Sequence, residues 1–169
     1  MPFDLQVNGY AGVDFCASEL QGEELEFACR ALDEDGVDGI LATIITDSLD
    51  RMVAKLSRLV SLREQSSLAR RMVAGIHIEG PFISPITGYV GAHPREAVVE
   101  ASLDGAKRLL DAAGGLTRVF TLAPEYDPRM ATTRFLSNEG VAVSAGHCDP
   151  TFEMLDEAIE NGLSMVSHF

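Results

Sequence analysis

The sequence predicts an α/β fold in which about six parallel strands alternate with helices. Six short apolar runs are separated by amphipathic segments, in units of about thirty residues, as in βαβ structure. A charged or amide residue, a glycine and a new apolar run recur at Asp35-Gly36-Val37, Glu139-Gly140-Val141 and Asn161-Gly162-Leu163. Such repeated junctions are typical of the loops that lead from a helix into the next strand.

This alternation fits either a doubly wound open sheet or a (β/α) barrel. No G-x-G-x-x-G follows the first strand and no Walker A motif occurs, so the nucleotide-binding signatures of many open sheets are missing. We therefore favour the barrel, although a complete one has eight strands and this sequence supplies six. The expected organisation is a single, incomplete (β/α) barrel domain over residues 1–169.

The strands are expected where short apolar runs end at glycine, proline or polar residues. The run over residues 39–45 is almost continuously apolar, as expected for a parallel strand buried on both faces. The first run breaks at Gly9-Tyr10-Ala11-Gly12, which we expect to be a flexible loop. The six predicted strands cover residues 3–8, 39–45, 72–79, 118–122, 141–145 and 163–168.

The helices are expected where apolar residues recur at intervals of three and four. Gly36 follows the first of them at the position of a C-terminal cap. Asp127-Pro128 and Asp149-Pro150 each indicate an N-cap followed by a proline in the first turn of a helix. The predicted helices cover residues 23–34, 49–62, 103–113, 127 to about 138 and 149 to about 162.

The longest predicted loop runs from residue 80 to about residue 101 and contains three prolines and three glycines. Loops of that length inside a compact domain are usually functional or mobile. We therefore interpret it as a lid or a substrate loop.

Composition limits the classes of function. With 13 basic and 26 acidic residues the net charge is −13, which disfavours binding to nucleic acid or to an anionic membrane. The three cysteines show no zinc-finger spacing, so we expect no disulfide framework and a cytoplasmic location. Neither a signal peptide nor a membrane anchor is apparent.

The residues with metal-binding chemistry gather at predicted strand ends. All four histidines lie in or just after a strand, and Glu79 ends the third. Because a barrel brings the C-terminal ends of its strands to one mouth, Glu79, His147 and His168 are expected to converge. Two imidazoles and a carboxylate with one position left for water compose an open catalytic zinc site. The alternative is that His147 and His168 are core histidines bonded to the backbone.

These stretches also carry a resemblance to a known family. The sequence resembles the N-acetylglucosamine-6-phosphate deacetylases of the amidohydrolase superfamily, in motif order and over nearly the whole chain. The motifs are Asp4-Leu5-Gln6-Val7-Asn8-Gly9, His77-Ile78-Glu79-Gly80-Pro81-Phe82, Gly91-Ala92-His93-Pro94, Leu122-Ala123-Pro124-Glu125, Ser144-Ala145-Gly146-His147 and Ser167-His168-Phe169.

The resemblance implies a distorted TIM barrel that binds a divalent metal, zinc or iron, through Glu79, His147 and His168. In this family Gln6 and Asn8 stand where many superfamily members carry two histidines, which implies one metal ion. Ala92, through its backbone, and His93, through its ring, correspond to the segment that contacts the substrate, a small phosphorylated amino sugar. We also expect a homo-oligomer.

The resemblance further implies that important groups lie outside these 169 residues. By this resemblance the general acid/base aspartate of the family lies beyond Phe169, so no catalytic residue is assigned in this sequence. The accessory β-sandwich segments and the last two barrel strands are also expected to be absent. Asp47, Glu125 and Asp149 are poor substitutes for that aspartate.

The expected activity is metal-dependent hydrolysis of the acetamido group of N-acetylglucosamine 6-phosphate, giving glucosamine 6-phosphate and acetate. Two alternatives remain open. In the first, the chain is an incomplete barrel that binds metal only. In the second, it is another amidohydrolase, which binds two metal ions and acts on a different small amide.

Overall fold

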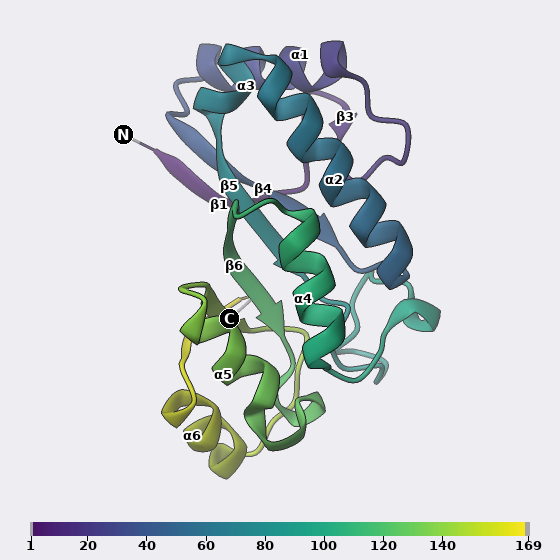
Figure 1. Ribbon diagram of the computed structural model, residues 1–169, viewed down its shortest axis with the longest axis vertical. Coiled ribbons are helices and arrows are strands. Elements are labelled where there is room, and N and C mark those ends of the chain that lie inside the picture. The colour runs from purple at the N-terminus through teal and green to yellow at the C-terminus, as the bar shows by residue number, and fades with distance from the viewer. Residues whose placement is uncertain (1, 168–169) are drawn as a thin grey trace.

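The computed structural model describes residues 2–167 and confirms the predicted alternation of strands and helices (Figure 1). The main sheet has six parallel strands in the order β1-β4-β5-β6-β7-β8. They are β1 (Phe3–Val7), β4 (Gly39–Ile45), β5 (Val73–Glu79), β6 (Thr117–Leu122), β7 (Ala142–Ala145) and β8 (Leu163–Val166). Each strand lies beside the one before it, whereas a doubly wound sheet reverses its order at a switch point. The fold is therefore a curled half of a (β/α) barrel.

The helices follow one another along the outside of this half-barrel. They are α1 (Gly22–Glu34), α2 (Leu49–Gln65), α3 (Ser67–Met72), α4 (Leu103–Ala112), α5 (Ala131–Asn138) and α6 (Phe152–Glu160). Figure 1 shows α1 to α3 near the first strands and α5 and α6 at the opposite end, and neighbours such as α2 and α4 are in contact. Within residues 2–167 no helix has the length and apolar character needed to span a membrane.

The core lies between the sheet and these helices. In β4 every residue from Gly39 to Ile44 is buried, because one face meets the helices and the other faces the barrel interior. Helix α2 buries Met52, Leu56 and Leu59, whose spacing places them on one side of the helix. At the carboxyl ends of the central strands, the rings of Phe82 and Phe120 stack with their centroids 5.8 Å apart.

The predicted loop after the first strand contains a small hairpin instead. Its strands are β2 (Gly9–Tyr10) and β3 (Val13–Asp14), which pair antiparallel. The two turn residues, Ala11 and Gly12, both have positive φ angles, of 49° and 85°, as a tight two-residue hairpin turn requires. The prediction failed because only one of the two turn positions is occupied by glycine.

The last two helices begin later than predicted. A short 3₁₀ turn (Pro128–Met130) follows Asp127, and the positive φ angles of Arg129 and Met130 interrupt the helical path there, so α5 begins only at Ala131. Asp127 nevertheless caps α5, since its carboxylate accepts the backbone N–H groups of Thr132 and Thr133. The prediction that Asp149 caps the following helix is wrong, because Thr151 accepts the N–H of Met154 at 3.3 Å.

Candidate metal centre

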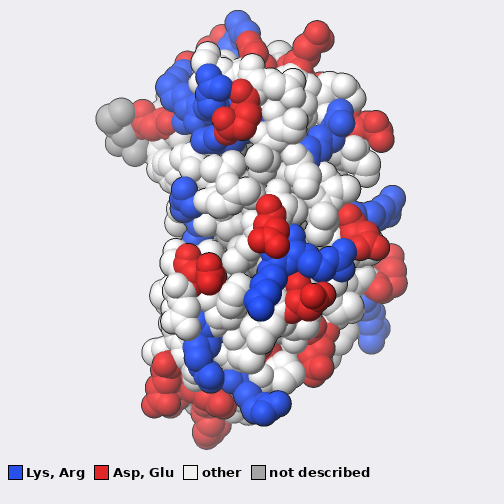
Figure 2. Space-filling model, in the orientation of Figure 1, with Lys and Arg blue, Asp and Glu red and all other residues white. Residues whose placement is uncertain are grey.

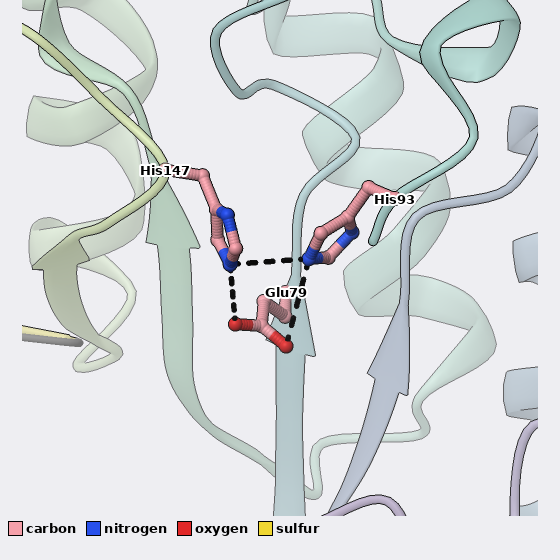
Figure 3. Close-up of side chains that lie close together, drawn as sticks. All are labelled: Glu79, His93 and His147. Atoms are coloured by element: carbon pink, nitrogen blue, oxygen red, sulfur yellow. Dashed lines mark hydrogen bonds and ion pairs between the residues drawn. The ribbon is translucent and has the colours of Figure 1, made fainter. Parts of the chain in front are cut away.

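Glu79 is the last residue of β5 and is 2% exposed. The chain turns away immediately after it, because Gly80 has a φ of 81° and a side chain there would collide with the Thr46 hydroxyl. That hydroxyl donates to the Glu79 carbonyl at 3.2 Å and so fixes the end of the strand. The carboxylate consequently points into the mouth of the half-barrel (Figure 3).

His147 approaches this carboxylate from the loop after β7. Its Nδ1 lies 2.9 Å from the backbone carbonyl of Tyr89, and its Nε2 lies 3.1 Å from Glu79 Oε1. A carbonyl oxygen can only accept, so Nδ1 carries a proton. In the protonated ring Nε2 donates a second proton to the carboxylate, and in the neutral ring Nε2 has a lone pair that a metal ion between it and the carboxylate would bind. This tautomer is the one that a metal bound at Nε2 requires.

His93 comes from the long loop after β5 and is 8% exposed. Its Nε2 lies 3.1 Å from His147 Nε2 and 4.0 Å from Glu79 Oε2, and the two imidazole rings meet edge to face. The loop is held in place by the Ser84 N–H, which donates to the His147 carbonyl at 2.9 Å. Gly91 lets the loop approach closely, since a side chain there would lie 3.1 Å from the His147 ring.

The three side chains fit a divalent cation. Within residues 2–167, Glu79, His93 and His147 form a group whose ligand atoms all lie within 4.8 Å of one another. The hydrogen bond to Glu79 is the main cause that raises the pKa of His147, and burial opposes it. Two imidazole nitrogens facing one buried carboxylate need a positive charge between them, which either a proton or a metal ion supplies.

Comparison with known proteins supports the family suggested by the sequence. No family model matches the chain. The N-acetylglucosamine-6-phosphate deacetylase of Bacillus subtilis is 33% identical over 98% of this chain, which spans 41% of that relative. A crystal structure of the Mycobacterium smegmatis deacetylase superposes with a TM-score of 0.86, at 28% identity, over 98% of this chain and 42% of that protein.

The predicted resemblance to the N-acetylglucosamine-6-phosphate deacetylases is confirmed. A mutant of the Mycobacterium smegmatis deacetylase, solved in complex with N-acetyl-D-glucosamine-6-phosphate, also matches, with a TM-score of 0.84 and 27% identity over 99% of this chain and 41% of that one. The chain thus spans about two fifths of the length of the deacetylases that it matches.

The structure brings together some of the predicted site residues. Glu79 and His147 lie side by side, and His93, predicted to contact the substrate, lies in the same group. Ala92 is exposed next to it. His168 lies outside the described residues. The individual roles of these residues stay predictions.

His77, although it faces the same side of β5 as Glu79, does not join this group. Its Nδ1 lies 3.1 Å from the Leu5 carbonyl and its Nε2 lies 2.7 Å from the Thr121 hydroxyl, so both ring nitrogens bond to protein atoms.

The other carboxylates considered as bases have partners of their own. Asp47 pairs with Lys55 at 2.8 Å; burial acts to raise the pKa of Asp47, but this hydrogen bond and the neighbouring positive charges lower it below its usual value. Glu125 accepts the backbone N–H of Asp149 at 2.6 Å, and burial raises the pKa of Glu125. Neither belongs to the group formed by Glu79, His93 and His147.

Proposed function

We propose that this chain forms the metal-binding part of a deacetylase that hydrolyses the acetamido group of N-acetylglucosamine 6-phosphate to glucosamine 6-phosphate and acetate. The observation that carries the proposal is the convergence of Glu79, His93 and His147 from three separate segments at the mouth of the half-barrel. The names of the matching proteins, and the bound sugar phosphate in one of them, support this substrate class.

The proposed cofactor is one divalent metal ion, zinc or iron. Glu79 and His147 would hold it together with His168, which the family resemblance assigns as the third ligand. Neutral imidazoles and a carboxylate are common zinc ligands and also suit iron. When bound in such a site, the metal polarises a carbonyl and lowers the pKa of its bound water.

The protein groups around the site have distinct proposed tasks. The Tyr89 carbonyl keeps Nδ1 of His147 protonated and thereby leaves Nε2 available as a ligand. The loop after β5 brings the His93 ring beside the same ligand atoms, where it is placed to orient the acetamido group. Ala92, exposed next to His93, would present its backbone to the sugar.

A second candidate function is metal binding without turnover. Deacetylation needs a general acid/base that takes a proton from water and delivers it to the leaving amine. Within the described part of the chain, Asp47 and Glu125 lie outside the candidate metal centre and already have partners. This placement favours a chain whose turnover depends on a group supplied from elsewhere.

The proposed partners are a small phosphorylated amino sugar and further copies of the chain, in the cytoplasm. On the face drawn in Figure 2, lysine and arginine side chains form small groups, and acidic side chains lie beside them. This pattern and the net charge of −13 support a function without nucleic acid.

The ligand role of Glu79 can be tested by replacing it with glutamine in the 169-residue chain and measuring bound zinc and iron. Glu79→Gln keeps the shape of the side chain but removes its charge, so we expect most of the bound metal to be lost. Glu160→Gln, an exposed change at the end of α6, is the matched control and should retain the metal. Full metal retention by Glu79→Gln would refute the assignment.

A further inference from the structure

An irregularity in β1 turns Gln6 toward the candidate metal centre. Between Asp4 and Val7 the strand advances three residues, while its partner β4 advances two, from Ile40 to Ala42. In a regular strand Gln6 would share the exposed face of Asp4, because side chains alternate. The extra residue is a β-bulge, a feature that re-aims side chains near functional sites.

Two hydrogen bonds hold this bulge. The backbone N–H of Gln6 donates to the Asp4 carboxylate at 2.9 Å. The carbonyl of Leu5, which belongs to the peptide leading into Gln6, accepts from Nδ1 of His77 at 3.1 Å. His77 is 2% exposed, and its other nitrogen is bonded to Thr121 of β6, so the ring is fixed on both sides.

The amide of Gln6 then contacts the carboxylate that faces the two histidines. Its Nε2 donates to Glu79 Oε2 at 3.0 Å, while Glu79 Oε1 faces His147. A carboxylate bonded through one oxygen can rotate little about its last side-chain torsion. The bond therefore directs the remaining oxygen toward His147.

We propose that Gln6 is a positioning residue that orients the Glu79 carboxylate for metal binding, and that the β1 bulge, anchored by His77, places it there. This inference rests on the proposed function, because it assumes that Glu79 is a metal ligand. Groups that orient a ligand in this way commonly change metal affinity by about 10- to 100-fold when removed.

The test is a zinc titration of the purified 169-residue chain, in competition with a chelator. Gln6→Met has nearly the same length but no donor, and Gln6→Asn is polar but too short to reach Glu79. Both should bind zinc about tenfold or more weakly, with unchanged unfolding midpoints of the metal-free chains. Gln65→Met, the same change at an exposed position at the end of α2, should bind zinc like the unmodified chain.

A second comparison separates positioning from a general effect on the fold. In the Glu79→Gln background, Gln6→Met should cause little further loss of zinc affinity, because the carboxylate it orients is gone. Two results would overturn the role of Gln6 without affecting the proposed metal centre. One is that the unmodified chain and Gln6→Met bind zinc equally well. The other is that Gln6→Met lowers the zinc affinity as much in the Glu79→Gln background as in the unmodified chain. Failure of the unmodified chain and Gln65→Met alike to bind zinc would overturn the proposed metal centre together with this inference.

Discussion

At the scale of single residues, the protonation of His147 links the candidate metal centre to pH. Its hydrogen bond to Glu79 is the largest cause that raises its pKa above the ordinary value of 6.5. A metal needs Nε2 without a proton, so protons and metal compete for the same position. We expect zinc affinity to fall as the pH is lowered through this raised pKa, which a zinc titration at several pH values would measure.

The hydrogen bond between His147 and Glu79 should also make the stability of the metal-free chain depend on pH. A histidine with a raised pKa in the folded state stabilises the fold fully below the unfolded pKa, and the contribution disappears as the pH rises through the folded pKa. The stability advantage of the unmodified chain over Glu79→Gln should therefore be larger at about pH 5.5 than at about pH 8.5. Urea unfolding with a chelator present would measure it, and a difference independent of pH would contradict the pairing.

The sequence predicts Glu79 and His147 to be neighbours because each lies at the carboxyl end of a strand, and parallel strands bring such positions to one edge. The place of His93 could not be predicted in this way. It depends on the path of the loop after β5, which is set by contacts such as that of Ser84 with the His147 carbonyl. The contact of Gln6 with Glu79 could not be predicted either. No sequence pattern reveals a bulge that shifts one side chain by one position.

At the scale of elements, Asp127 is the group on which the start of α5 depends. It is 3% exposed, and its carboxylate accepts from Thr132 N at 3.0 Å and from the N–H and hydroxyl of Thr133 at 2.7 Å each. Asp127→Ala should lower the free energy of unfolding by about 2 kcal/mol, since it leaves buried N–H groups unpaired. Urea denaturation would show this loss, whereas Asp156→Ala, on an exposed position of α6, should change stability little. Equal stability of the two variants would refute the role of Asp127 as a cap.

The strands were predicted more accurately than the starts of the last two helices, and the reason is physical. The second strand of the main sheet is an almost continuous apolar run, and the predicted range 39–45 matches β4 residue for residue. Helix starts depend on which side chain reaches the free N–H groups, and Asp127 does so across a 3₁₀ turn that no periodicity reveals. At Asp149 two capping residues were available, and Thr151 is the one used.

At the scale of the whole molecule, the half-barrel has two open edges. Within residues 2–167, strands β1 and β8 each pair with one neighbour only, and both carry exposed apolar side chains, with Leu5 at 47% and Val166 at 56% exposure. Unpaired strand edges of this kind favour association with another chain, in keeping with the proposed homo-oligomer.

We expect Leu5→Lys to shift the chain toward the monomer, because a charged side chain on an edge strand opposes pairing. Light scattering would measure the mass in solution. Phe152→Lys removes an apolar group that is 84% exposed on a helix, α6, and not on an edge strand, so it should leave the mass unchanged. A monomeric unmodified chain would contradict the proposed association.

The central claim is that this chain carries a metal centre of the deacetylase type. The most direct measurement is the zinc and iron content of the purified 169-residue chain, made together with an assay of N-acetylglucosamine 6-phosphate deacetylation. We predict about one metal ion per chain, lost in Glu79→Gln, and no turnover by the 169-residue chain alone, because the family resemblance implies a general acid/base beyond Phe169. A chain that binds no metal after reconstitution with zinc or iron would contradict the account.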